Sequence, residues 1–217
     1  MKKKQFFILT LIITFNLKIQ SQTKPCIERN PCEIKATKLY VFIGKKIREK
    51  YIYNNYCGEI PFDQEYKAKY KIIKNIYGDY PNKKIEFYAY EHGLSVKRYS
   101  DYEYILLYVA EYCGKLQMLR YQYQPLYKTK NGDFASPYNY YHFKKLDSTT
   151  TIKPQKIEFK KTVSQSFKYI SDFMKIVYPE PYYEIKDNKV IAKYGNYPEE
   201  LFEIKKSTVL KKFGFFK

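Results

Sequence analysis

Polar and apolar residues alternate most clearly along residues 65–90. In the first half of this stretch, apolar side chains and lysines take turns: Tyr66, Ala68, Tyr70 and Ile72 alternate with Lys67, Lys69 and Lys71. A period of two is typical of a strand with one buried and one solvent-exposed face. Residues 78–82 break the pattern with glycine, proline and asparagine, after which Ile85, Phe87 and Ala89 resume it. The stretch predicts a β-hairpin, and we expect the rest of the chain to cover its apolar face.

Apolar runs on either side of this hairpin predict three more strands. The run 39–47 contains Gly44, and a glycine inside a strand pattern indicates a bulge or a sharp bend. Residues 104–109 are almost continuously apolar, as in a strand that is buried on both faces. Residues 116–127 fit a returning strand. About five strands with irregular loops between them favour a small closed or partly closed barrel.

The period changes after residues 144–154, a polar and threonine-rich stretch that favours a linker. Apolar residues then recur at helical spacing, at Val163, Phe167, Ile170, Met174 and Val177. Thr162 and Gln165 fit a capping box at the start of such a helix. Prolines at positions 179 and 181 would end it. The pattern predicts a helix over residues 163–177.

The C-terminal residues continue this mixed pattern. Residues 183–185 and 190–192 flank an Asp-Asn turn, as in a hairpin. Pro198 and the two glutamates after it suit the first turn of a helix, although residues 201–216 also fit a strand. Because this tail has few apolar residues for a core of its own, we expect it to pack on the barrel. The expected fold class is mainly β, a five-stranded OB-like barrel (residues 23–145) with a small α+β C-terminal extension (residues 146–217).

Residues 1–22 have the pattern of a signal peptide. Three lysines at positions 2–4 precede the apolar run 6–15, and Ser21 offers a small residue near the expected cleavage point. The run is too short to span a bilayer, which takes about 20 residues. The sequence therefore predicts a secreted or periplasmic protein with no transmembrane segment after processing. An uncleaved signal anchor is the alternative.

Export to an oxidising compartment changes how the four cysteines, Cys26, Cys32, Cys57 and Cys113, are interpreted. Disulfides are favoured there over free thiols and over a zinc site. No Cys-x-x-Cys pair is present, so the spacing gives no support to a zinc ribbon. Four cysteines allow three pairings, and the sequence does not choose among them. We expect neither a metal nor another cofactor.

The chain is strongly basic, with a formal net charge of +18. Such an excess attracts anionic surfaces, nucleic acid or acidic glycans. Only four of the 40 basic residues are arginine, however, and a dedicated phosphate reader would use more arginine for its bidentate geometry. We therefore expect no specific nucleic acid as partner. The wet face of the hairpin, with Lys67, Lys69 and Lys71, is the candidate surface for an anionic partner.

The predicted strands resemble a known family in their order. The segments are Leu-Tyr-Val-Phe-Ile-Gly-Lys (39–45), Tyr-Lys-Ile-Ile-Lys-Asn-Ile-Tyr-Gly (70–78), Ile-Glu-Phe (85–87) and Tyr-Ile-Leu-Leu-Tyr (104–108). This order resembles the netrin-like domain, which is shared with tissue inhibitors of metalloproteinases and found in bacterial exported proteins. The resemblance covers roughly residues 26–128 and implies an OB fold.

The chain departs from the inhibitors of that family at its first cysteine. Those inhibitors chelate a protease zinc through a cysteine at the first position of the mature chain. Here Cys26 lies about four residues beyond the expected cleavage point, and no Cys-x-Cys follows it. The resemblance therefore does not carry zinc-protease inhibition to this chain unless cleavage occurs directly before Cys26.

Two histidines complete the candidate chemistry. His92 follows the hairpin beside Glu91, and a hydrolase could place its unrecognised site there, with Ser95 nearby in sequence. His142 lies with Tyr140 in an aromatic segment that could stack on a ligand.

No phosphate loop, nucleophile elbow or zinc-protease motif is present in the sequence. The sequence therefore favours an exported, non-catalytic binding module for an unknown protein or anionic surface. An exported hydrolase and a structural cell-envelope protein are the alternatives.

Overall fold

The structure is a computed structural model that describes residues 35–54, 56–58, 62–92, 98–144 and 151–217. The predicted signal peptide and the cysteines at 26 and 32 lie outside these residues. The described chain is mainly β, as expected. Its first part contains β1 (Lys38–Ile52), β2 (Gln64–Tyr77), β3 (Lys84–Glu91), the 3-10 turn η1 (Tyr99–Asp101), β4 (Tyr104–Tyr112) and β5 (Lys115–Lys128).

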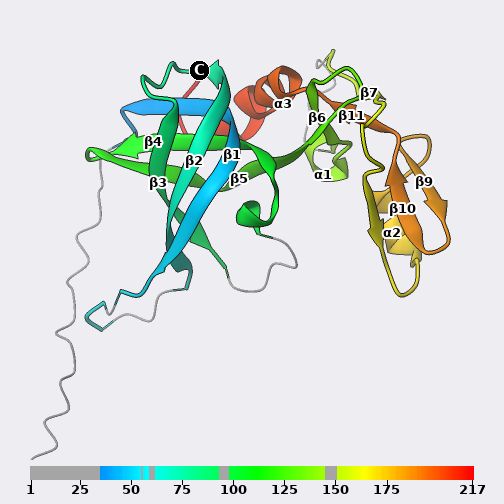
Figure 1. Cartoon of the computed structure of the whole chain (residues 1–217), viewed down its shortest axis with the longest axis horizontal. Coiled ribbons are helices and arrows are strands. Elements are labelled where there is room, and N and C mark those ends of the chain that lie inside the picture. The colour runs from blue at the N-terminus through cyan, green and yellow to red at the C-terminus, as the bar shows by residue number, and fades with distance from the viewer. Residues whose placement is uncertain (1–34, 55, 59–61, 93–97, 145–150) are drawn as a thin grey trace, which may run out of the picture.

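These five strands lie side by side in the order β3-β2-β1-β4-β5, and every neighbouring pair is antiparallel. A parallel bridge between Tyr88 and Gln117 also joins β3 to β5, the two outer strands of this run. Figure 1 shows the strands curling around one another. The predicted hairpin is confirmed, because β3 pairs along its whole length with residues 64–71 of β2, with Glu65 opposite Tyr90.

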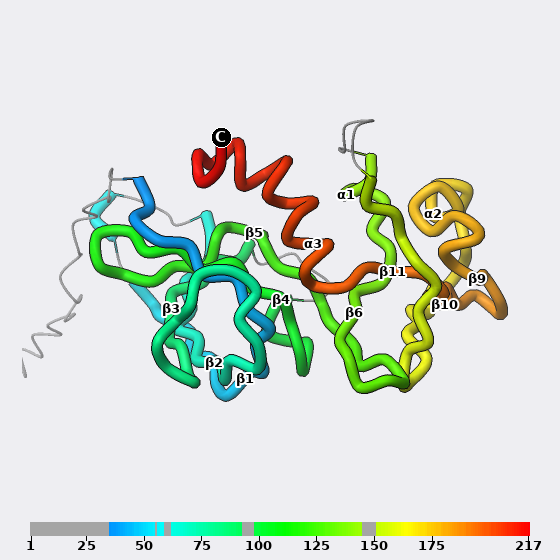
Figure 2. The backbone as a smooth tube through the Cα atoms, turned by 90° about the horizontal axis from the view of Figure 1, so that it is seen from above, coloured from blue at the N-terminus to red at the C-terminus, as the bar shows by residue number. Residues whose placement is uncertain are grey.

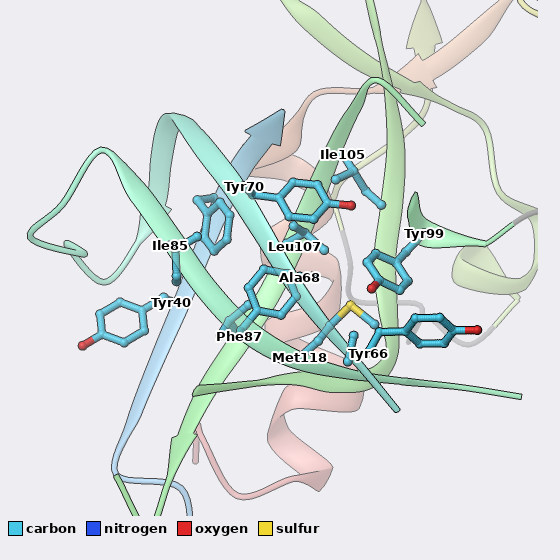
Figure 3. Packing of buried hydrophobic residues seen from close by; sticks show 13 residues of the cluster. Tyr40, Tyr66, Ala68, Tyr70, Ile85, Phe87, Tyr99, Ile105, Leu107 and Met118 are labelled. Carbon is cyan, nitrogen blue, oxygen red and sulfur yellow. The ribbon is translucent and has the colours of Figure 1, made fainter. Parts of the chain in front are cut away.

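The alternating side chains of the hairpin divide as the period of two predicts. Tyr66, Ala68 and Tyr70 are buried and face the interior, where they meet Ile85 and Phe87 of β3 (Figure 3). The interior cluster also contains Ala89 of β3, Tyr99 of η1 and residues of the other three strands: Tyr40, Phe42, Ile105, Leu107, Val109 and Met118. All five strands thereby contribute side chains to one hydrophobic core.

Gly44 marks an irregularity in β1, as the sequence predicts. The register between β1 and β2 shifts between Ile43 and Gly44. A Cβ atom at position 44 would lie 3.0 Å from the ring of Tyr70 and 3.2 Å from Leu107. The missing side chain lets these buried residues pack against the backbone where the strand bends.

Strand β4 is buried on both faces, which confirms the prediction from the continuous apolar run 104–109, and residues 39–44 of β1 are buried in the same way. Their outward residues, among them Val41, Leu106 and Tyr108, are covered by Leu201 and Phe202 of the helix α3 (Pro198–Lys205). Figure 2 shows α3 lying along this side of the strands. The C-terminal residues therefore pack on the sheet formed by β1 and β4, as expected. After α3 follow a π-helical turn, η2 (Lys206–Leu210), and the remaining residues.

Strand β6 (Phe134–Pro137) follows β5 and continues the large sheet toward the extension. Strand β11 (Tyr194–Asn196) pairs with β6 and with β7 (Gln155–Lys156), so residues far apart in sequence meet here. A separate three-stranded sheet has the order β8-β10-β9. The remaining elements are α1 (Tyr140–Phe143), β8 (Ser164–Ser166), α2 (Asp172–Val177), β9 (Tyr183–Lys186) and β10 (Lys189–Ala192).

The predicted helix over residues 163–177 is wrong in its first half. Residues 164–166 form β8, which pairs with β10 through Gln165 and Val190. The helix α2 starts only at Asp172, and its N-cap is Ser171, whose hydroxyl accepts a hydrogen bond from the Met174 N–H. Strand pairing with β10 satisfies the backbone of residues 164–166, which overrides the helical spacing of the apolar residues.

Gln165 in β8 also rules out the predicted capping box, whereas two other predictions for the extension are confirmed. Strands β9 and β10 form the expected hairpin, and Asp187 and Asn188 in its turn both have positive φ angles. Helix α3 begins with Pro198 at its first position, which decides between helix and strand for the residues that follow. No helix among the described residues combines the length and the apolar character needed to cross a membrane.

Candidate functional site

The lysines predicted as a binding surface lie on the outer face of β2, opposite the buried tyrosines. Lys71 has a basic neighbour on each side, because it faces Lys45 of β1 and Lys84 of β3. Three lysines therefore stand in one row across three strands. Like charges directly opposite each other in a sheet are destabilising, so this row of lysines destabilises the folded state.

The same arrangement continues along the strands. Lys67 faces Lys50, and Lys69 faces Arg48. We call the whole set the basic face: Lys45, Arg48, Lys50, Lys67, Lys69, Lys71 and Lys84. All of its members are exposed except Lys69, which is half-buried.

Two carboxylates partly neutralise the basic face. Glu86 forms an ion pair with Lys67 at 2.8 Å and another with Arg48 at 3.1 Å. Hydrogen bonds from these two side chains hold the pKa of Glu86 below its ordinary value. Glu103 pairs with Lys45 at 3.1 Å. The seven basic residues still outnumber the two acids, so the face carries a net positive charge.

Tyr140 and His142, the other predicted binding residues, are not brought together with the lysines. They belong to α1, which follows β6, and Figure 1 places this helix well away from β2. Tyr140 packs against the cluster formed by Tyr138, Tyr183, Val190 and Ala192, while the Nε2 atom of His142 lies 3.0 Å from the Nε2 atom of Gln124. Packing of the extension accounts for both positions.

His92 lies just after β3 with its Nδ1 atom 3.0 Å from the Phe62 carbonyl oxygen. An imidazole that donates from Nδ1 to a carbonyl keeps Nε2 as an acceptor. The ring also stacks on Phe62, with 4.2 Å between the centroids, and Nδ1 lies 3.8 Å from Asp63. Ser95, the nucleophile that the hydrolase hypothesis would need, lies outside the described residues. That hypothesis therefore stays a prediction.

Asp63 holds together a cluster that the sequence did not reveal. Its side chain is only 4% exposed. It forms an ion pair with Arg120 at 3.0 Å and accepts a hydrogen bond from the Tyr121 hydroxyl at 3.0 Å. Both partners come from an irregular stretch of β5, where Tyr121 has a φ angle of 59° and the register with β4 shifts nearby. The bulge turns Arg120 and Tyr121 toward the start of β2.

The scarcity of arginine was the signal that could have revealed these contacts. Each of the three described arginines pairs with a carboxylate: Arg48 with Glu86, Arg98 with Glu49 at 2.9 Å, and Arg120 with Asp63. Arginine's planar fork suits such pairs better than lysine's point charge. In a chain that uses lysine nearly everywhere, an arginine therefore marks a structural ion pair.

Glu91 is a buried acid near the same end of the strands. The residue is 1% exposed, and neither carboxylate oxygen has a hydrogen bond of good geometry in the described part of the chain. Burial raises the pKa of Glu91, and the nearby Tyr99 N–H and Arg98 offset this only in part. Glu49 adds to the rise through its own negative charge.

The cysteines that the structure describes, Cys57 and Cys113, are not free thiols, and both are in the disulfide-bonded state. Cys26 and Cys32 lie outside the described residues, so the predicted pairing stays open at this point. Within the described ranges, no group of three or more histidine, cysteine or acidic side chains is arranged to hold a metal ion.

Comparison of the chain with protein-family models, with curated proteins and with solved structures finds no match. The resemblance to netrin-like domains therefore stays a prediction. Function has to be argued from the geometry of the surfaces just described.

Proposed function

We propose that the chain is an exported binding module in which an OB-like barrel presents its basic face to an anionic polymer. Two features support the barrel. The strand order β3-β2-β1-β4-β5 and the bridge from β3 to β5 suit a ring of five strands. In OB folds, the face of the second and third strands is a common ligand surface. The basic face lies on β1, β2 and β3.

The row Lys45–Lys71–Lys84 carries the proposal. A fold without an anionic partner would gain stability by placing an acid at one of these positions, because cross-strand charge pairs are worth about 0.2–1 kcal/mol each. An anionic polymer bound across the row would remove the repulsion and add charge attraction. Lysine contributes point charges and little geometric selectivity, so we expect binding that depends on salt and discriminates weakly between polyanions.

Charge reversal on the basic face tests this proposal. Lys69→Glu combined with Lys71→Glu should lower the salt concentration at which the protein elutes from immobilised heparin or polyphosphate. Lys211→Glu combined with Lys212→Glu is the matched control, because these lysines are also exposed and the net charge changes equally. The proposal fails if both double variants elute together, since retention would then follow net charge and not the basic face.

A further inference from the structure

The helix α2 and the residue three positions before it carry an unusual exposed surface. Tyr169, Phe173 and Ile176 are 70%, 63% and 54% exposed. Phe173 and Ile176 are three residues apart and share one face of α2, and Tyr169 lies in the bend just before the helix. We call these three side chains the α2 knob. Figure 2 shows α2 at the end of the molecule farthest from β3.

The α2 knob is not part of the core of the extension. Phe167, Ile170 and Tyr178, which alternate with its residues in sequence, pack against the buried cluster around Tyr183. The same short segment therefore places one set of apolar side chains inward and another outward. Single exposed apolar residues are ordinary, whereas several grouped on one short element mark a surface that meets a partner.

Lysines flank the segment that carries the α2 knob. Lys168 precedes Tyr169, and the backbone N–H of Phe167 donates to the Asn188 carbonyl at 2.9 Å, which brings this segment beside the β9–β10 turn. Lys186 and Lys189 face each other across that turn. All three lysines are exposed.

Lys175, on α2 itself, is also exposed. The acids of this region are Asp172, which pairs with Lys175 at 2.9 Å, Glu180 just after the helix, and Asp187 in the turn. The lysines outnumber the acids, so the charged residues of this region, which we call the positive collar, carry a net positive charge.

We propose that the α2 knob docks on an anionic lipid bilayer. Aromatic and aliphatic side chains on a small protrusion can enter the boundary between headgroups and acyl chains, where tyrosine is well suited. Lysines around them gain about 1 kcal/mol each near an anionic membrane surface. The positive collar thus complements the charge of such a membrane, and this inference does not rest on the basic face of the barrel.

The size of the knob favours a bilayer over a protein partner. Three side chains of this kind expose on the order of 400 Å². A stable protein interface takes about 800 Å² from each partner. A bilayer has no such minimum, because each inserted side chain adds its own transfer free energy.

Vesicle binding by the exported protein tests the inference. We expect co-sedimentation with vesicles of phosphatidylglycerol and phosphatidylcholine, and much weaker binding to phosphatidylcholine alone. Phe173→Ser should lower the partition coefficient about tenfold. Lys168→Gln should lower it about fivefold. Tyr169→Ser should weaken binding, whereas Tyr53→Ser is the matched control, because Tyr53 is 74% exposed but lies just after β1.

Heparin retention separates this site from the basic face. Phe173→Ser should keep the heparin retention of the unmodified protein, and thermal unfolding should show an unchanged midpoint because the side chain is exposed. The inference is overturned if Phe173→Ser binds vesicles as well as the unmodified protein does. It is equally overturned if only Lys69→Glu with Lys71→Glu abolishes vesicle binding. A dimer that depends on Phe173 and does not bind vesicles would identify a second copy as the occupant instead.

Discussion

Glu91 is the clearest case of a single residue that breaks the alternation of apolar and polar positions along a strand. The period of two places residue 91 on the inward face of β3, together with Ile85, Phe87 and Ala89, so an acid occupies an apolar position. Arg98 lies close enough to favour the charged form but pairs with Glu49. A buried carboxylate without adequate hydrogen bonds destabilises the folded state when it is ionised.

Glu91 gives a stability prediction whose sign depends on pH. Because its pKa is raised in the folded protein, Glu91 is tolerated best at low pH, and its contribution worsens as the pH rises above the ordinary value for glutamate. Glu91→Gln should therefore stabilise the protein at pH 7.5 by about 1 kcal/mol and less at pH 4. Urea titrations at both pH values measure this difference.

Glu86→Gln provides a control of opposite sign. The pKa of Glu86 is lowered by Lys67 and Arg48, so its contribution is present at neutral pH and is lost as the solution becomes acidic. The glutamine variant should be less stable than the unmodified protein at pH 7.5, and the difference should shrink at pH 4. An effect of Glu91→Gln that is the same at both pH values would contradict a buried ionised carboxylate.

Whole elements were predictable where one physical signal dominated. The alternation in β2 and β3 has no competing interpretation, and the continuous apolar run of β4 reflects burial under α3 on one face and in the interior cluster on the other. The residues from 163 onward carry a helical spacing, yet part of the segment pairs with β10. Pairing partners distant in sequence leave no local pattern, so β8 could not be predicted from its own residues.

The candidate surfaces were predictable to a similar extent. Lys67, Lys69 and Lys71 could be assigned to a wet face from their spacing alone. Their basic neighbours on β1 and β3 depend on the strand register, which the sequence does not reveal. The contact of Asp63 with Arg120 depends on a bulge in β5, and the α2 knob depends on which residues the extension buries. Tertiary packing decides each of these.

The contact between β6 and β11 leads to a second prediction, at Gly195. A Cβ atom there would clash with the Ser136 backbone oxygen across the strand pair. Gly195→Ala should therefore destabilise the protein by about 1–3 kcal/mol and reduce amide protection in β6 and β11 first. Hydrogen exchange followed by mass spectrometry measures the loss.

Gly114→Ala is the comparison for Gly195. Gly114 has a φ angle of 73°, but a Cβ atom at this position would have no other atom within 4 Å, so its substitution adds only backbone strain. Its effect should be centred on the β4–β5 turn. Equal protection of β6 in the Gly195→Ala variant and the unmodified protein would argue against the close approach.

In the molecule as a whole, the length of β1 constrains the disulfides. Cys113 lies two residues after Glu111, which faces Lys38 at the start of β1, whereas Cys57 follows the end of the same strand at Ile52. Fifteen residues of strand span up to about 50 Å. A disulfide needs Cα atoms within about 7 Å. Because the segments after Ile52 and Glu111 are short compared with β1, we expect that Cys57 and Cys113 do not pair with each other.

Peptide mapping under non-reducing conditions checks this exclusion. Since both cysteines are disulfide-bonded, we expect each to be linked to a peptide that contains Cys26 or Cys32. Two of the three pairings remain, and digestion between Cys26 and Cys32 would distinguish them. A peptide that joins Cys57 directly to Cys113 would contradict the strand geometry.

The cover that α3 provides for β1 and β4 has a consequence for the order in which the chain can mature. Translation delivers Val41, Leu106 and Tyr108 long before Leu201, Phe202 and Leu210, the residues that shield them. Until those later residues emerge, the nascent sheet exposes the apolar side chains of β1 and β4 to its surroundings, and chaperones bind such surfaces, which otherwise drive aggregation. The outer faces of β1 and β4 can therefore be covered only after almost all of the described chain has been synthesised.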